Sequence, residues 1–432
     1  MATTLKNKNS GWTKTVLNDP QYFRVVGSGV DVWVGKKNFL STKSVQGTKI
    51  ASIESEVDYF NRPSRANMQP KVGRVAFAKM RDTFKVLLSD EELSKFYILS
   101  TGFALIEPQI ESTYLYQVVQ TQRFNLQKDR YAEGSTQQAI SQSDFDKLTI
   151  SFPEDRQEQR KIAEVFATID DAIEKTDTLI EKYKRMKTGM MQDLFRYGID
   201  DKGKIRSEKT HKFKSSPLGR IPIEWSVSNF ELVRHPTKPY IKTGPFGSSL
   251  KGEHWVTEGT PVITIGALGE GSIIKSELMY ITPKKAKSLN AYRVSDGDLV
   301  FSRVADVGRS IIISNLEDGW VMSSNLMRIT LDVNKILPRF THSNLIYDHR
   351  IREQINRKVN AGGREVANTK ILSELLFILP ALKEQKRICE AIALFDELIS
   401  NEIMFREKLF HQKCGLMEDL LTGAVRVNHL AK

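Results

Sequence analysis

The stretch IKTGPFGSSLKG, from Ile241 to Gly252, has the residue types of a loop that could hold a phosphate group. Glycines let a backbone come close to an anion, and serine hydroxyls and lysine ammonium groups can bind it. A catalytic phosphate loop would continue as Gly-Lys-Ser/Thr at the start of a helix, and this stretch does not. Two interpretations stay open: a binding loop with Ser248, Ser249 and Lys251 near a polyanion, or a structural turn.

Other patterns that could indicate catalysis are weak or missing. The glycines of Gly266–Gly271 lack the strand, helix and downstream acid of a dinucleotide-binding loop. Asp296-Gly-Asp298 is typical of a turn rather than a nuclease acid cluster. The seven histidines and two cysteines show no metal-ligand spacing. Gly-x-Ser-x-Gly and the Asn/Asp-Pro-Pro-Tyr/Phe motif of methyltransferases are also missing. We therefore expect no catalytic residues, no metal and no cofactor in this chain.

The charge balance favours a polyanionic partner. The 432 residues include 64 Lys and Arg against 52 Asp and Glu, a net charge of +12. Nucleic acid is the usual polyanion, although a solvated basic surface would give the same balance. Basic residues on predicted loops, with two serines, form the candidate DNA-binding set, suited to phosphate contacts and guanine readout: Arg62, Arg65, Lys71, Arg74, Lys79, Lys242, Ser248, Ser249, Lys251, Arg303, Arg309 and Arg364.

Cysteine use and hydropathy point to the cytoplasm. Cys389 and Cys414 are expected on one helix, where 25 residues separate them by about 40 Å, too far for a disulfide. Unpaired thiols suit a reducing compartment. The N-terminus has no hydrophobic targeting segment, and no stretch reaches the roughly 18 apolar residues that a membrane span needs. We expect a cytoplasmic protein with no membrane partner.

An internal repeat is the most informative feature of the sequence. EQRKIAEVFATIDDAIE begins at Glu158, and EQKRICEAIALFDELIS begins 226 residues later at Glu384. Upstream, GRVAFAKMRDTF (73–84) parallels GDLVFSRVADVG (297–308) more loosely. The chain therefore reads as domain, long helix, linker, domain, long helix.

The two repeated helices have the heptad pattern of a coiled coil. From Ile162 and from Ile388, most positions at 3.5-residue spacing are apolar over five heptads. Polar residues interrupt both seams, at Lys187, Glu402, Arg406 and Lys413. They could set the register, bind a partner or mark a frayed seam, and we favour register. An antiparallel pairing of the two copies would give a pseudo-twofold molecule.

Both globular regions read as mixed α/β, with many short strands. Residues 294–307 and 310–314 are examples, because Gly and Asp punctuate their β-branched runs. The best helix outside the repeat is expected over 340–359. The polar segment from about 200 to 223 is interpreted as an exposed connection.

Several stretches together resemble the specificity (S) subunits of type I restriction-modification systems, over essentially the whole chain. They are GPFGSSLK at Gly244–Lys251, SPLGRIPIEW at Ser216–Trp225, the two EQ-containing helix starts at Pro153–Asp170 and Pro380–Ile388, MQDLF at Met191 and MEDLLTG at Met417. One departure is that the first domain has no clear GPFGSSLK, and its nearest candidate is Val26-Gly-Ser-Gly29.

The resemblance implies an α+β fold with two mixed α/β target-recognition domains joined by two long helices in an antiparallel coiled coil. Its parts would be target-recognition domain 1 (1–152), a central conserved helix (153–199), a linker (200–224), target-recognition domain 2 (225–379), a C-terminal conserved helix (380–423) and a tail (424–432).

The resemblance also implies a function: a non-catalytic subunit that reads a bipartite sequence in double-stranded DNA. Two methyltransferase (M) subunits would bind the helices and supply S-adenosylmethionine and adenine-N6 methylation. Restriction (R) subunits would supply ATP- and Mg²⁺-dependent cleavage. Base-reading residues do not transfer by motif. The alternatives are a coiled-coil scaffold that binds protein without sequence-specific DNA binding, and a stand-alone nuclease or methyltransferase with degenerate motifs.

Overall fold

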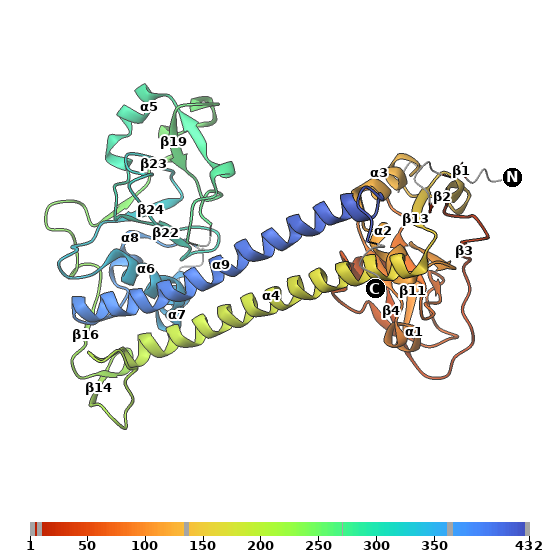
Figure 1. Ribbon diagram of the computed structural model, residues 1–432. Helices are drawn as coiled ribbons and strands as arrows, with labels where there is room; N and C mark the ends of the chain where they lie inside the picture. The colour runs from red at the N-terminus through yellow and green to blue at the C-terminus, as the bar shows by residue number, and fades with distance from the viewer. Residues whose placement is uncertain (1–4, 7–10, 134–137, 270, 361–365, 428–432) are drawn as a thin grey trace. The chain divides into compact units, whose positions relative to one another are not determined.

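The computed structural model describes residues 5–6, 11–133, 138–269, 271–360 and 366–427 (Figure 1). The chain forms two compact units. Unit 1 comprises Met1–Thr178 and Ile403–Lys432, and unit 2 comprises Leu179–Glu402. Two long helices, α4 (Arg156–Tyr197) and α9 (Leu382–Leu420), each contribute one segment to each unit. The helices contain the two copies of the sequence repeat that begin at Glu158 and Glu384.

Among its described residues, unit 1 contains two four-stranded sheets, two smaller ones and three short helices. The first sheet has the order β10 (Val86–Leu88), β9 (Val75–Ala78), β12 (Phe103–Pro108), β3 (Phe23–Val26). The second has the order β7 (Ser55–Val57), β4 (Lys37–Leu40), β11 (Tyr97–Ser100), β8 (Ala66–Met68). The remaining elements are β1 (Leu5–Lys6), β2 (Trp12–Val16) and β13 (Thr149–Pro153), the pair β5 (Val45–Gln46) and β6 (Lys49–Ile50), and helices α1 (Glu91–Phe96), α2 (Ser112–Val118) and α3 (Gln122–Arg130).

Unit 2 is built in a similar way. Its first sheet has the order β22 (Ser310–Ile312), β21 (Leu299–Ser302), β24 (Leu326–Ile329), β17 (Ile241–Thr243). Its second has the order β18 (Trp255–Val256), β20 (Met279–Ile281), β19 (Thr260–Ile263), β23 (Val321–Met322). The remaining elements are the pairs β14 (Phe213–Ser216) with β15 (Gly219–Pro222) and β16 (Ser226–Ser228) with β25 (Phe377–Leu379), and helices α5 (Pro283–Ser288), α6 (Pro338–Tyr347), α7 (His349–Asn360) and α8 (Thr369–Ser373).

The first sheets of the two units are equivalent strand by strand. In both, a central antiparallel hairpin (β9–β10 or β21–β22) pairs through its first strand with β12 or β24, which in turn pairs with the edge strand β3 or β17. The hairpin turns match as well, because Asp82 and Asp306 both have positive φ, at 53° and 39°. The internal repeat therefore extends through the globular domains.

Each unit has one main hydrophobic core that includes both long helices. In unit 1, Phe77 and Phe124 pack with ring centroids 5.1 Å apart, and Phe166 of α4 and Leu420 of α9 join the same cluster. In unit 2, Leu194 of α4 and Ile388 of α9 join the cluster around Trp225. Burying a large apolar side chain contributes about 1.5–3 kcal/mol, so the helices are part of each domain's core rather than tethers.

The helix segments run antiparallel within each unit, and ion pairs cross between them. In unit 1, Asp170 pairs with Lys413 at 2.6 Å and Asp177 with Arg406 at 2.5 Å. Residue numbers therefore rise along α4 in the direction in which they fall along α9. In unit 2, Lys187 pairs with Asp396 at 2.6 Å. The pairs Lys187–Asp396 and Lys413–Asp170 occupy equivalent positions in the two copies of the sequence repeat. This is the arrangement expected if the polar seam residues set the register of the two helices.

The chain after each long helix returns to the start of the other helix within the same unit. In unit 1, Arg426 donates to both carboxylate oxygens of Glu158, at 2.6 and 2.7 Å. In unit 2, Arg206 donates to Glu384, with Nη2 3.1 Å from Oε2, and Trp225 Nε1 lies 3.0 Å from the same oxygen. Glu158 and Glu384 are both buried. In each unit, a buried carboxylate at the start of one long helix therefore binds the chain segment that follows the other long helix.

One prediction of local structure was wrong. The helix expected over 340–359 is two helices, α6 and α7, which break at Asp348. The Asp348 carboxylate accepts the Arg350 backbone N–H at 3.0 Å, which starts a new helix there. Most of the linker is exposed, and β14 and β15 form a hairpin within it.

Candidate nucleic-acid interface

Two basic residues stand at equivalent ends of the central strands. Lys79 follows β9, and Arg303 follows β21. The Lys79 N–H donates to the Gly102 carbonyl at 3.0 Å, and the Arg303 N–H donates to the Asn325 carbonyl at 3.1 Å. Gly102 and Asn325 lie in the turns before β12 and β24. Backbone bonds therefore hold one predicted DNA-binding residue at the same place in each domain, which we call the sheet-end site.

Lys79 has the environment of a cation without a counter-ion. Its side chain is half-buried, and burial lowers the pKa of its ammonium group. It lines a hollow of about 50 Å³ together with Ser28 and Thr101. Within the described ranges, no carboxylate forms an ion pair with it. An incoming phosphate would be a favourable partner, because a charge-assisted hydrogen bond is stronger where water is partly excluded.

The GPFGSSLK loop is attached to the sheet-end site of unit 2 through Gly244. Its N–H donates to the Leu326 carbonyl at 2.9 Å, and a Cβ on it would lie 1.9 Å from the Ser323 carbonyl oxygen. Only glycine fits there, so this end of the loop is a structural close approach. Beyond it, Phe246, Ser248 and Lys251 are exposed, and Ser249 is half-buried in the 3₁₀ turn Gly247–Ser249. The structural and the binding interpretation thus apply to different parts of one loop.

The first domain has a counterpart of this loop in position but not in sequence. Gly27-Ser28-Gly29 follows edge strand β3, as Gly244-Pro245-Phe246 follows edge strand β17. The Gly29 N–H donates to the Asn67 carbonyl at 2.8 Å, which holds the segment against β8. The nearest candidate in the sequence therefore lies at the topologically equivalent position.

Two residues of the candidate set have internal roles. Arg74 is buried, and its guanidinium donates to the Glu107 carboxylate at 2.6 and 2.9 Å and to the Gln69 carbonyl at 3.0 Å. Arg309 donates to the Ile265 carbonyl at 3.1 Å. Its counterpart in unit 1, Lys85, likewise binds a carbonyl, that of Thr42 at 2.5 Å. These side chains therefore bind groups of their own domains.

Three others lie on the surface of unit 1. Arg65 forms an ion pair with Glu54, and Lys71 one with Asp31 at 3.0 Å. Exposed ion pairs contribute about 0–1 kcal/mol, so a phosphate could displace these carboxylates. Arg62 stacks over the Tyr59 ring at 4.4 Å and lies 5.7 Å from the Trp33 ring, next to the exposed Phe60. The aromatic residues of this group were missed in the sequence, where nothing places Trp33 beside Tyr59.

The remaining members of the set lie in unit 2. Lys242 is half-buried, with its ammonium group 5.3 Å from the centre of the Tyr292 ring. Arg364 lies outside the described residues.

Sequence reasoning also missed the residue that supports the hairpin of unit 1. Lys128 is buried, and its ammonium group donates to the carbonyls of Met80 and Thr83, both at 2.8 Å, and contacts Asp129 at 3.2 Å. The desolvation lowers its pKa, and Asp129 counters part of that effect. Its spacing of four from the buried Phe124 on α3 was the one available signal of burial.

Neither a metal centre nor a membrane span is visible in the described part of the chain. No group of three or more His, Cys, Asp or Glu side chains could hold a metal ion there. No helix within the same ranges is long and apolar enough to cross a membrane.

On the binding interpretation of the GPFGSSLK loop, replacing Lys251 by Ala should weaken DNA binding across all sequences, because an exposed lysine that contacts the DNA backbone neutralises one phosphate. The slope of log K against log salt should become shallower by about one unit. The measurement is a fluorescence-anisotropy titration of the assembled complex at several salt concentrations. Lys287→Ala, an exposed lysine of α5 in the same domain, is the control. An unchanged slope for Lys251→Ala would remove this contact.

Comparison with known proteins gives one consistent result. The family model for the type I restriction modification DNA specificity domain matches residues 30–183 and 241–406. The type I restriction enzyme MjaVIII specificity subunit of Methanocaldococcus jannaschii is 23% identical over 347 residues, 78% of this chain and 76% of the relative. The putative type I restriction enzyme MjaX specificity subunit of the same organism is 27% identical over 373 residues, 84% of this chain and 78% of the relative.

Two solved structures share the fold. One, from a study of complex assembly and conformational transition of the type I R-M system, has a TM-score of 0.62 at 15% identity, covering 96% of this chain and 99% of the other. The other, the type I restriction-modification S subunit from M. genitalium, has a TM-score of 0.54 at 16% identity, covering 98% and 99%.

Proposed function

We propose, from the premise that this chain belongs to the family of type I restriction modification DNA specificity proteins, that each sheet-end site contacts one block of a split DNA target. The chain is the DNA-recognition subunit of such a system and not itself an enzyme. The observation that carries the proposal is the duplicated position of Lys79 and Arg303. A basic side chain held by backbone bonds at the same point of two equivalent domains suits two similar contacts to one duplex.

In unit 2 the GPFGSSLK loop would add contacts to the DNA backbone. Ser248, Ser249 and Lys251 follow the fixed Gly244, so their donors are presented from an anchored segment. In unit 1, Arg62, Arg65 and Lys71 would add exposed positive charge, with Arg62 also able to read guanine. Arg74 and Arg309 are left out of the proposed contact set, because Arg74 is buried against the Glu107 carboxylate and Arg309 donates to the Ile265 carbonyl at 3.1 Å. The Arg303 guanidinium is held less tightly, since its Nε lies 3.4 Å from the Ala367 carbonyl.

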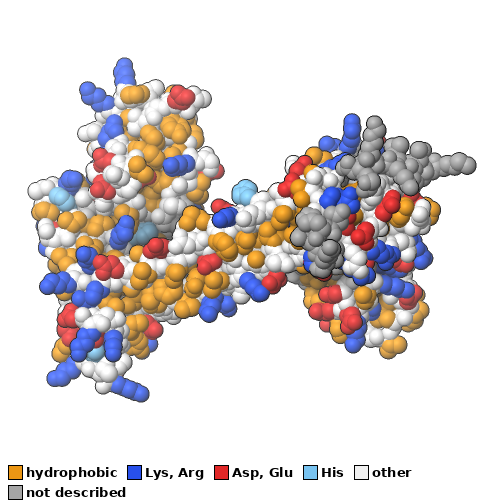
Figure 2. Space-filling model, in the orientation of Figure 1, with side chains coloured by type: hydrophobic (Ala, Val, Ile, Leu, Met, Phe, Trp, Pro, Cys, Tyr) orange, Lys and Arg blue, Asp and Glu red, His pale blue; other side chains and the backbone are white. Residues whose placement is uncertain are grey.

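Two methyltransferase subunits are proposed to bind the long helices. Large apolar side chains are exposed along α9: Leu394 and Leu398 in unit 2, and Met404, Phe405 and Phe410 in unit 1. Figure 2 shows hydrophobic side chains along the exposed faces of the long helices. Contiguous exposed apolar surface of this kind is typical of a protein-binding face. The methyltransferase subunits would carry S-adenosylmethionine, and restriction subunits would carry ATP and Mg²⁺.

Adenine methylation across the genome tests the proposal. Cells with this chain and its cognate methyltransferase subunit should show a new split motif of two short blocks, which cells without this chain lack. Exchanging residues 1–152 for those of a relative should change one block only. An assembled complex with no change in methylation would exclude the function, and would favour a protein-binding scaffold instead.

A further inference from the structure

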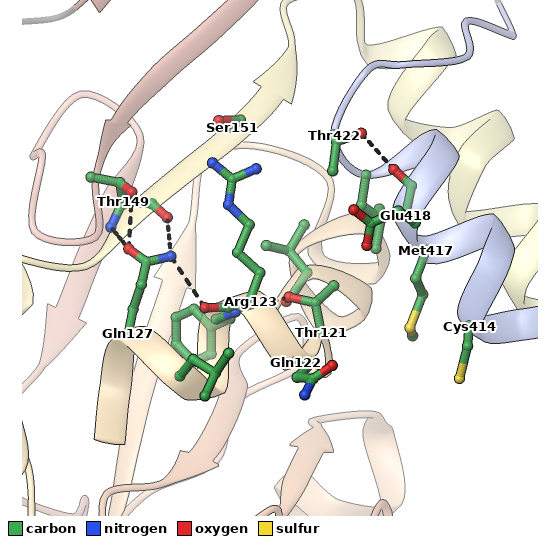
Figure 3. Close-up of a pocket in the computed structure, with 14 residues that line it drawn as sticks. Thr121, Gln122, Arg123, Gln127, Thr149, Ser151, Cys414, Met417, Glu418 and Thr422 are labelled. Atoms are coloured by element: carbon green, nitrogen blue, oxygen red, sulfur yellow. Dashed lines mark hydrogen bonds between the residues drawn. The ribbon is translucent and has the colours of Figure 1, made fainter. Parts of the chain in front are cut away.

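A pocket of about 570 Å³ in unit 1 lies among α3, β13 and the last turns of α9 (Figure 3). Its walls are partly apolar, with Val118 and Leu126 on one side and Met417 and Leu421 on the other. Cys414, an exposed free cysteine of α9, also lines it. The pocket is thus open, accessible and large enough for two or three side chains of another molecule.

One cation in this pocket has no partner. Figure 3 shows the Arg123 side chain extending from α3 toward Ser151, with Glu418 on the opposite wall. Among the described residues, no carboxylate forms an ion pair with Arg123. The neighbouring Gln127 is by contrast fully engaged with Thr149, through bonds of 2.9 Å to its hydroxyl and 3.0 Å to its N–H. Among the described residues of this wall, Arg123 is therefore the cation that can still bind an anion.

Unit 2 contains an equivalent pocket of about 560 Å³. The arginine of that pocket, Arg350, already binds groups of the same chain. Arg350 has the same place in α7 as Arg123 in α3, one residue after the start of the helix. Its guanidinium donates to the Asp348 carboxylate at 2.7 Å, to the Phe195 carbonyl at 2.8 Å and to the Leu218 carbonyl at 3.3 Å. Leu218 lies in the turn between β14 and β15, so the linker covers one side of this pocket.

Among its described residues, unit 1 lacks two of the three groups that bind the arginine in unit 2, the carboxylate of Asp348 and the turn with Leu218. Thr121, the N-cap of α3, stands where Asp348 precedes α7. The linker turn with Leu218 has no counterpart among the described residues of unit 1. To match the pocket of unit 2, the pocket of unit 1 would have to bind a carboxylate and a turn that carries an aliphatic side chain.

We propose that this pocket of unit 1 receives an acidic turn of the methyltransferase subunit, an inference that rests on the proposed function. A carboxylate of that turn binds Arg123, and an aliphatic side chain packs between Met417 and Leu421. A nucleic acid fits less well, because a single arginine faces Glu418 across a partly apolar wall and offers little to a polyanion.

The two cysteines of the chain make the pocket directly measurable. Cys414 faces the pocket and is exposed, so a bound turn would shield it from alkylation. Cys389 is half-buried, and burial raises its pKa to about 11, so its thiol reacts slowly near pH 8 whether or not a partner is bound. Cys389 therefore serves as the internal reference within the same chain.

The experiment is alkylation of the full chain by iodoacetamide at pH 8, alone and in complex with its cognate methyltransferase subunit, followed by mass spectrometry. Alkylation of Cys414 should slow about tenfold or more in the complex. Arg123→Glu should weaken the affinity for the methyltransferase subunit by about 10- to 100-fold, as expected for a lost charge-assisted hydrogen bond. Arg130→Glu, an exposed arginine of the same helix outside the pocket, should leave the affinity unchanged.

Thr121→Asp is a second variant that copies the arrangement of unit 2. Asp is as good a helix cap as Thr, so the fold should be kept. The new carboxylate should form an ion pair with Arg123 and so lower the affinity for the methyltransferase subunit. A complex that forms normally but leaves Cys414 reacting at its free rate would overturn the pocket proposal and leave the proposed function standing. If no complex forms with the unmodified chain, both are overturned.

Discussion

Replacing Arg206 by Met should destabilise unit 2 by about 3–5 kcal/mol, because the change leaves the Glu384 carboxylate buried without its ion-pair partner. Arg206 and Glu384 are 8% and 4% exposed. The carboxylate also accepts the Ile199 N–H at 3.0 Å, so the pair joins the end of α4 to the start of α9. Native-state hydrogen exchange is the measurement, since two units need not unfold together. Amides in the first turns of α9 should lose the most protection.

Two further variants test the cause. Arg387→Met removes a guanidinium that pairs with the exposed Asp201, and should cost no more than about 1 kcal/mol. Adding Glu384→Gln to Arg206→Met removes the uncompensated charge, so it should restore part of the lost stability. If Arg206→Met and Arg387→Met have equal effects, the buried carboxylate is not the centre of this contact.

Gly244→Ala should disrupt the second recognition domain at its GPFGSSLK loop. A Cβ there would meet the Ser323 carbonyl oxygen at 1.9 Å, so the GPFGSSLK segment would have to move away from the strands. We expect a stability cost at the upper end of the roughly 1–3 kcal/mol typical of overpacking. In the genome-wide methylation assay, one block of the split motif should weaken or disappear while the other is kept.

Gly247→Ala is the matched control for this loop, since a Cβ at Gly247 would meet nothing within 4 Å. It should leave both blocks of the motif intact. Loss of both blocks in Gly244→Ala, together with a loss of the folded protein, would point to global unfolding instead of a local displacement. Equal effects of the two alanines would show that the close approach at Gly244 does not position the loop.

The long helices could be predicted from the sequence because their signals are local and repeated. The heptad periodicity gave α4 and α9, and the repeat made Lys187 and Lys413 stand out as equivalent seam positions. Their partners Asp396 and Asp170 became visible only when the two segments lay side by side. The break at Asp348 was missed because apolar periodicity continues through it while its carboxylate caps a new helix.

The site was predictable only in part, since side-chain contacts between distant segments decide which charges are free. Lys79 and Arg303 were identified through loop position, and the structure gives them equivalent backbone contacts. Arg74 has the same residue type but lies opposite Glu107 of β12, which no local pattern reveals. Arg123 was not identified from the sequence, because what distinguishes it is that no carboxylate of the described residues pairs with it. Only the structure shows this.

The way in which Lys79 and Arg303 are held has an evolutionary consequence. Both are fixed through their main-chain amides, which every residue except proline possesses. These backbone bonds do not depend on the side chain, so either residue can change by a single mutation while the sheet end keeps its place. If the sheet-end sites contact DNA as proposed, each domain can change its DNA target independently of the other, and selection can test one altered block at a time.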